Sequence, residues 1–302
     1  MTSFTIYSYA FKGLYEFDPV SGEEELAHVN VNESVAQKQQ LFESFFDNAD
    51  SYARFVRKRR SYGCQLLWRA HNIIALRIEN RRTIKRDINF QTDEIETFPW
   101  VVVIIDNRKD IQHIAILNRP KAFSNPNTVA DIMQETFNIY LRQFRLTISI
   151  NPQYRAHDFW NLLEQYRPWG IKRIQFNFAF PNKDWATEMM GELAELSKNA
   201  NGDAQLGFEA RKDETLTFQP NVPKNRELVN AATGTGQDIL IKPINHKTIH
   251  TQKELCPVER TMKDRTFKAL EENKYTQEVH RQVETFCNAC LPYYDVQETT
   301  TE

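Results

Sequence analysis

The stretch WVVVIIDNRKDIQHIAIL, residues 100–117, decides the fold class of this chain. Residues 100–105 are all apolar, as expected for a strand that is covered on both faces of its sheet. Residues 106–110, DNRKD, have the composition of a turn, and the chain then returns as the apolar run IQHIAIL. The stretch therefore predicts a strand hairpin inside a buried sheet.

Helices and strands alternate downstream of this hairpin. Apolar residues at spacings of three and four predict a helix from Thr128 to Phe144, with a capping box formed by Thr128 and Asp131. Further helices are predicted at 154–166, 184–196 and 225–232, and strands at 146–150, 174–180, 204–210 and 238–244. Strands joined through crossover helices pair in parallel, so the expected fold class is α/β (α+β) with a mixed, partly parallel β-sheet and packed helices.

Three regions are expected along the chain. Residues 1–96 predict a small N-terminal α+β lobe, with a helix over 33–60, a strand pair at 64–68 and 73–78, and an edge strand or loop over 79–97. Residues 97–245 form the mixed-sheet α/β core. Residues 246–302 hold one long C-terminal helix, from about Val258 to Cys290, and a tail.

Composition restricts the class of protein. The 302 residues carry a formal net charge of −2, and 41% of them are hydrophobic, as in a globular protein that is not a polycation. No signal peptide and no apolar run of about 18 residues is present, and four cysteines fit a reducing compartment. We therefore expect a cytoplasmic protein without a membrane span. No motif indicates a cofactor, so none is expected.

Charge divides the first ninety residues sharply. From Gly13 to Asp50, nine acidic residues stand against Lys38, a net charge of −8, whereas from Arg54 to Asp87 nine Arg and two Lys stand against two acids, a net charge of +9. The basic stretch could neutralise several phosphates of a nucleic acid, with Tyr62 and Trp68 stacking on bases. The candidate nucleic-acid-binding residues are Arg54, Arg57, Lys58, Arg59, Arg60, Tyr62, Arg81, Arg82, Lys85 and Arg86.

Two further roles for the basic stretch stay open. Its cations could pair with the acidic segment that precedes them in the chain, which would make the stretch structural. They could also bind an acidic partner protein, within a multi-protein complex or a homo-oligomer.

A metal site and a nuclease site are weaker hypotheses. The candidate metal ligands are His246, His250, Cys287 and Cys290, with Cys256 and His280 nearby in the sequence. Thiols near the end of an amphipathic helix are commonly just buried, however. For a metal-dependent nuclease, Asp106 follows a buried strand, and Glu209 and Lys212 follow another, with Asp203 before it. Asp106 could equally open a turn, and Glu209 could face solvent.

A family resemblance covers about residues 98–243. The phrases FPWVVVIIDNRKDIQHIAI, FRLTISINPQY, IKRIQFNFAFPN and LVNAATGTGQDILIK resemble an uncharacterised bacterial protein family of phage-defence, abortive-infection-type loci. The resemblance implies an intracellular bacterial setting and a role in antiviral defence. It implies no catalytic residues and does not distinguish a sensor from an effector. The leading hypothesis is a defence component without catalytic activity that contacts DNA or RNA through the Arg-rich stretch.

Overall fold

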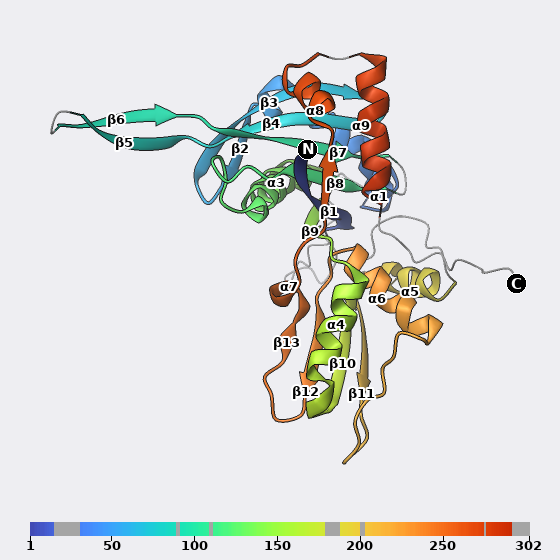
Figure 1. Ribbon diagram of the computed structural model, residues 1–302. Helices are drawn as coiled ribbons and strands as arrows, with labels where there is room; N and C mark the ends of the chain where they lie inside the picture. The colour runs from blue at the N-terminus through green and yellow to red at the C-terminus, as the bar shows by residue number, and fades with distance from the viewer. Residues whose placement is uncertain are drawn as a thin grey trace, which may run out of the picture. The chain divides into compact units, whose positions relative to one another are not determined.

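A computed structural model describes residues 1–14, 31–88, 91–108, 111–178, 188–199, 203–274 and 276–291. The chain folds into two compact units (Figure 1). The first unit comprises Met1–Ile150 and Glu259–Cys287, and the second comprises Asn151–Val258 and Asn288–Glu302. The boundary expected at residue 96 thus falls inside the first unit, and the one expected at residue 245 falls inside the second.

The main sheet belongs to the first unit. Its strands follow the order β14-β1-β8-β7-β4-β3-β2, and β9 also pairs with β1. The strands are β1 (Thr2–Gly13), β2 (Arg54–Arg57), β3 (Arg60–Ala70), β4 (Ile73–Glu79), β7 (Trp100–Asp106), β8 (His113–Leu117), β9 (Leu146–Pro152) and β14 (Glu259–Met262). The predicted hairpin of residues 100–117 is confirmed as β7 and β8, which pair directly.

The main sheet is antiparallel and curls as a half-barrel, so the mixed α+β class is confirmed but its expected parallel strands are wrong. All six neighbouring pairs along the order from β14 to β2 are antiparallel. The reason is that β1, from the start of the chain, takes the position beside β8. The helix that follows β8 therefore does not carry the chain to a parallel neighbour of β8.

Helices cover both faces of this sheet (Figure 1). Alternation along β1 shows the two faces: Phe4 contacts Phe267 and Phe286, whereas Tyr9 and Phe11 contact Phe42. One layer holds α8 (Asp264–Glu271) and α9 (Gln277–Ala289), and the other holds α1 (Val31–Ser44) and α3 (Pro126–Leu141), which is followed by the 3₁₀ helix η1 (Arg142–Phe144). Strand β7 is buried almost throughout, as its apolar run predicts.

The helix expected over 33–60 is wrong in its second half. Helix α1 ends at Ser44, the short α2 spans Ala49–Tyr52, and the chain then enters β2. Phe55 of β2 is fully buried, with its ring 5.5 Å from that of Phe137 on α3. The β-strand wins because it buries Phe55 and pairs with β3, whereas a continued helix would expose the same ring.

Residues 80–99 form an arm between β4 and β7, and we refer to them as the arm. Strands β5 (Arg82–Ile88) and β6 (Gln91–Thr97) pair as a separate two-stranded sheet that extends away from the main sheet (Figure 1). The expected edge strand or loop is therefore a hairpin.

The long C-terminal helix is also wrong, because residues 259–289 form a strand and two helices. Strand β14 pairs with the start of β1, in the register Thr2↔Met262. Helix α8 ends before Asn273, which has the positive φ of 54° typical of a helix end. The chain then turns into α9.

The second unit contains a four-stranded antiparallel sheet in the order β11-β10-β12-β13. Its elements are β10 (Ile171–Phe178), β11 (Ala204–Glu209), β12 (Ile239–Pro243), β13 (Ile249–His250), α4 (Ala156–Tyr166), η2 (Arg167–Trp169), α5 (Glu188–Asn199), α6 (Pro223–Gly234) and α7 (Thr251–Glu254). Ile174, Phe176 and Phe178 of β10 alternate into its core. The parts of the predicted elements at 179–180 and 184–187 lie outside the described residues.

Candidate functional site

The Arg-rich stretch begins in a tight hairpin turn. Lys58 and Arg59 join β2 to β3 and are its only two loop residues, since Arg57 pairs with Arg60. Both have positive φ, 46° and 67°. Such turns favour Gly and Asn, and a left-handed conformation costs another residue type about 1–2 kcal/mol. Two long basic side chains are therefore held where the backbone disfavours them.

This turn is fixed to helix α3. The guanidinium of Arg57 forms an ion pair of 2.5 Å with Asp131, and the backbone N–H of Lys58 donates to Oε1 of Glu135 at 2.9 Å. The side chains of Lys58 and Arg59 are exposed, as is that of Arg54 on β2. In the part of the chain that the structure describes, these three side chains have no hydrogen-bond or ion-pair partner.

Arg60 connects the turn to the base of the arm. Its Nη2 donates to the side-chain oxygen of Asn80 at 2.9 Å and to the carbonyl of Arg81 at 2.7 Å. Its guanidinium also lies over the ring of Tyr62, 5.2 Å from the centroid.

The two aromatic residues of the stretch are buried. Tyr62 and Trp68 are each only 8% exposed, and Tyr62 contacts the ring of Phe123. A buried ring presents no face on which a base can stack. Neither residue can therefore form a stacking platform at the surface.

The arm is electrically neutral. Between residues 81 and 97, four cations stand against four acids: Arg81, Arg82, Lys85 and Arg86 against Asp87, Asp93, Glu94 and Glu96. Arg81 pairs with Glu96, and Lys85 pairs with Glu94 at 3.0 Å. Arg82 and Arg86 have no such partner among the described residues. Half of the arm's candidate cations are thus neutralised within the arm.

Other cations of the stretch also bind groups of the chain itself. Arg69 forms ion pairs with Glu43 at 3.2 Å and Asp47 at 2.5 Å. Arg77 donates to the carbonyl of Glu271, and its guanidinium lies 4.8 Å from the ring centroid of Trp100. The pairing of the basic stretch with the acidic segment is therefore present at Arg69. The acids at residues 16–25 lie outside the described residues.

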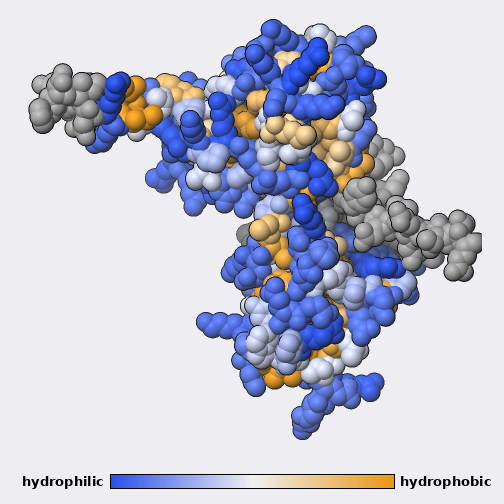
Figure 2. All heavy atoms as spheres, in the orientation of Figure 1, coloured by the Kyte–Doolittle hydropathy of each residue, from blue (hydrophilic) through white to orange (hydrophobic). Residues whose placement is uncertain are grey.

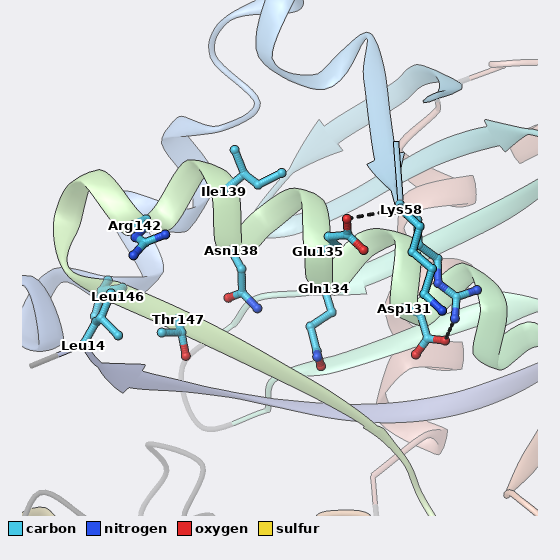
Figure 3. A pocket seen from close by; sticks show the side chains of 11 residues that line it. Leu14, Lys58, Asp131, Gln134, Glu135, Asn138, Ile139, Arg142, Leu146 and Thr147 are labelled. Atoms are coloured by element: carbon cyan, nitrogen blue, oxygen red, sulfur yellow. Dashed lines mark hydrogen bonds and ion pairs between the residues drawn. The ribbon is translucent and has the colours of Figure 1, made fainter. Parts of the chain in front are cut away.

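Five exposed or half-buried cations at the turn and the base of the arm have no carboxylate partner in the described part of the chain, and we call them the basic surface: Arg54, Lys58, Arg59, Arg60 and Arg82. Beside it, a groove of about 860 Å³ follows α3 (Figure 3). Arg57 and Lys58 line one end of this groove together with Asp131 and Glu135, and Ile139 on α3 is 64% exposed. The groove therefore offers charges of both signs and an apolar contact.

The nuclease candidates do not assemble in either unit. Asp106 is 2% exposed, and its carboxylate accepts from Nε of Arg108 at 2.9 Å and from Nη2 at 2.7 Å. This guanidinium occupies the carboxylate oxygens that a divalent ion would need. Glu209, Lys212 and Asp203 are exposed residues of the second unit. Asp106 therefore serves here to close the turn after β7.

The candidate metal ligands lie in different environments. Nδ1 of His250 lies 2.6 Å from Oδ2 of Asp238, and the ring of His246 contacts that of Trp169 at 4.9 Å. Cys287, in the first unit, is buried on α9, and Cys290 is also buried. His280 lies 3.1 Å from His71, and Cys256 is exposed. Within the described residues, no group of three or more possible metal ligands occurs.

The strained turn and the neutral arm were not predicted from the sequence, although both leave a signal in it. In RFVRKRRSYG, Phe55 and Tyr62 lie symmetrically about the Lys58–Arg59 dipeptide, as they would in a two-residue hairpin. In the arm, a basic run is followed by an acidic run of equal charge, as expected when two strands pair their side chains across a turn.

Comparisons with known proteins add no assignment. None of the helices in the described part of the chain has the length and apolar character of a membrane span. A scan against protein-family models, a search of the curated proteins and a search of the solved structures each found no match to this chain.

Proposed function

We propose that this protein binds nucleic acid through the basic surface, without catalytic activity of its own, as a component of a bacterial antiviral defence system. The observation that carries the proposal is the turn at Lys58 and Arg59. Two adjacent cations occupy left-handed backbone positions, are exposed and have no partner for their side chains in the described part of the chain. Strain of this kind persists where the rest of the fold enforces it, and it concentrates at functional positions.

The chemistry of this surface favours phosphate over base recognition. Arg and Lys bind the phosphate backbone and release condensed counterions, which makes the affinity depend on salt. Since Tyr62 and Trp68 are buried, the surface offers no aromatic platform for bases. We therefore expect binding with little sequence preference. The resemblance over residues 98–243 supports the antiviral setting of this proposal.

The proposal is tested by reversing the charge of the turn. In the variant Lys58→Glu/Arg59→Glu, affinity for a short duplex should fall. The slope of log affinity against log salt should become less negative by about 1.8, since each lost phosphate contact contributes about 0.9. The measurement is fluorescence anisotropy of a labelled duplex, and of a labelled single-stranded RNA, over a series of salt concentrations.

A matched control separates local contact from net charge. Lys247→Glu/Lys253→Glu makes the same charge change at two exposed lysines of the second unit. We expect this control to keep the wild-type salt slope. If the two double variants lose affinity equally, the contact is not located at the turn, and the proposal is wrong.

A second candidate is an acidic protein segment bound in the groove along α3. The exposed Ile139 and the apolar Leu14 and Leu146 line this groove together with Lys58, a combination suited to a peptide with one apolar anchor and a negative charge. Under this alternative, a partner remains bound after nuclease treatment and is released by Ile139→Asp. The nucleic-acid proposal predicts that Ile139→Asp leaves duplex binding within about twofold, because Ile139 makes no phosphate contact.

A further inference from the structure

One face of the arm exposes an apolar pair. Ile84 on β5 and Ile95 on β6 lie directly opposite each other, and they are 52% and 45% exposed. Directly opposed residues of an antiparallel pair point to the same face, which we call the Ile84 face. Figure 2 shows hydrophobic residues at the surface of the arm among hydrophilic ones. The pair is therefore open to contact with a ligand.

The Ile84 face also carries two cations of the same strand. Arg82 lies two residues before Ile84 and Arg86 lies two residues after it, and side chains two apart on a strand point to the same face. In the described part of the chain, neither guanidinium forms an ion pair. On the other face, by contrast, Lys85 pairs with Glu94 at 3.0 Å. The cations available to an anionic ligand thus flank the apolar pair.

The arm continues the main sheet without a change of register. Glu79 of β4 lies opposite Trp100 of β7, and Arg82 of β5 lies opposite Thr97 of β6. The two pairings are offset by the same number of residues on both strands, so the base of the arm contains no bulge. Side chains therefore keep their alternation from β4 into β5, and each face of the arm prolongs one face of the sheet.

Arg60 identifies the sheet face that the Ile84 face prolongs. Its Nη2 donates to the side-chain oxygen of Asn80 at 2.9 Å, and Asn80 lies two residues before Arg82. Arg57, which lies opposite Arg60 in the hairpin, pairs with Asp131 of α3. The Ile84 face is therefore on the side of the sheet where the basic surface is fixed to α3.

We propose that the arm enters the major groove of a B-form DNA duplex, with Ile84 and Ile95 against the base edges and Arg82 and Arg86 against the phosphates of one groove wall. The inference rests on the proposed function and names double-stranded DNA as the ligand of the basic surface. The major groove is about 12 Å wide and admits a two-stranded β-ribbon. Apolar side chains in it contact the methyl groups of thymine.

The position of the arm permits this contact. Its outer part projects beyond the helices that cover the main sheet (Figure 1). Because a groove winds obliquely around the duplex, a duplex whose groove holds the arm lies across the arm and does not run back over the sheet. The near side of such a duplex faces the base of the arm, where Arg60 binds the carbonyl of Arg81.

The same geometry disfavours a duplex of RNA. The major groove of an A-form helix is deep and narrow, and side chains cannot reach the bases through it. The arm could then contact only the outer phosphates, and the apolar pair would stay in water. Affinity should therefore be higher for a DNA duplex than for an RNA duplex of the same length and sequence.

One acid opposes binding on the Ile84 face. Asp93 is exposed and lies directly opposite Arg86, on the strand that faces the second wall of the groove. The phosphates of that wall repel a carboxylate. Removal of this charge should therefore strengthen binding of DNA, which is a gain that a loss of folding cannot imitate.

The first test compares the two duplexes by fluorescence anisotropy with the full chain. The wild type should bind the DNA duplex at least about tenfold more tightly than the RNA duplex. Ile84→Ser/Ile95→Ser should bind DNA at least about fivefold more weakly, because the apolar contact is lost. Its salt slope should stay unchanged because no charge is removed, and it should bind the RNA duplex as the wild type does.

The second test uses neighbouring cations on opposite faces of the arm. Arg86→Ala should make the salt slope for the DNA duplex less negative by about 0.9, as expected for one lost phosphate contact. The matched control Lys85→Ala removes the same charge from the other face and should keep the wild-type slope. Asp93→Asn should bind the DNA duplex at least about twofold more tightly than the wild type.

The outcomes separate this inference from the proposed function. Equal wild-type affinity for both duplexes, with a salt slope that changes in Lys58→Glu/Arg59→Glu but not in Arg86→Ala, leaves the proposed function intact and overturns the inference. An isoleucine variant that binds DNA as tightly as the wild type also overturns it. A wild type that binds neither duplex overturns both. Unchanged circular dichroism and melting temperature verify that the variants are folded.

Discussion

Lys58 and Arg59 show how a residue can oppose its local backbone preference. The turn between β3 and β4 is also left-handed at two positions, but it uses His71 and Asn72, which tolerate that conformation better. At Lys58 and Arg59, neither side chain relieves the strain through a partner in the described part of the chain. The sequence therefore retains cations at this turn at a cost in stability.

We predict that substitutions in the Lys58–Arg59 turn can stabilise the fold and weaken nucleic-acid binding at the same time. Replacement by the dipeptide that such turns prefer, Lys58→Asn/Arg59→Gly, should raise the free energy of unfolding by about 1–2 kcal/mol. The same variant should weaken duplex binding, because two phosphate contacts are lost. Denaturant unfolding and fluorescence anisotropy measure the two effects. A variant that is more stable and binds as tightly as the wild type would show that the strain serves no role in binding.

At the scale of elements, helix α3 organises the hairpin that carries the basic surface. Its N-cap is Asn125, whose side chain accepts from the N–H of Asn127, with Pro126 opening the helix. The predicted capping box at Thr128 and Asp131 is therefore wrong. Asp131 lies in the second turn of α3, and its carboxylate pairs with Arg57 of β2. The opposite side of α3 places Phe137 among the rings of α1 and β2.

The prediction for this element concerns Phe137. It is fully buried, and its ring centroid lies 4.8 Å from Phe42, 5.1 Å from Phe45 and 5.5 Å from Phe55. Phe137→Ala should lower the free energy of unfolding by about 3–5 kcal/mol, because it removes an aromatic ring from a packed cluster. Ile139→Ala, on the exposed side of the same helix, should change it by less than about 0.5 kcal/mol. Chemical denaturation of both variants provides the measurement, and equal effects would contradict the packing argument.

At the scale of the whole molecule, the first unit is built from two separate parts of the chain. Residues 259–287 follow residues 151–258 of the second unit in the chain, and they supply β14, α8 and most of α9. Phe4, in the first strand, is covered by Phe267 and Phe286 from this returning part. The first unit is therefore complete only after residues 151–258 of the second unit have been synthesised.

This connectivity predicts the effect of a truncation. A chain that ends at Val258 should lose protection of β1 from hydrogen exchange, because it lacks the β14 pairing and the two helices that cover one sheet face. The strands of the second unit, whose order is β11-β10-β12-β13, should keep more of their protection. Unchanged protection at β1 would show that the returning part is dispensable for the first unit.

Local patterns in the sequence determined which segments are strands and helices wherever the apolar period was strong. The runs at 100–105, 114–117 and 146–150 became strands, and the helices after residues 125, 155 and 222 form where the spacing predicts them. The charge pattern identified the Arg-rich stretch. It also left open that this stretch pairs with the acidic segment before it, and Arg69 does pair with Glu43 and Asp47 of that segment.

Strand partners, and therefore which charged side chains are paired or buried, depend on the folded structure. Strand order depends on contacts between residues distant in sequence, such as Phe4 with Leu117 and Thr2 with Met262, which no local period encodes. The same long-range contacts buried Tyr62 and Trp68 and left Lys58 and Arg59 exposed, while the turn after β7 neutralised Asp106 with Arg108. The positions of the charges and apolar runs along the chain can therefore be read directly from the sequence. The fold decided which charges stay available, because availability depends on what is brought beside them.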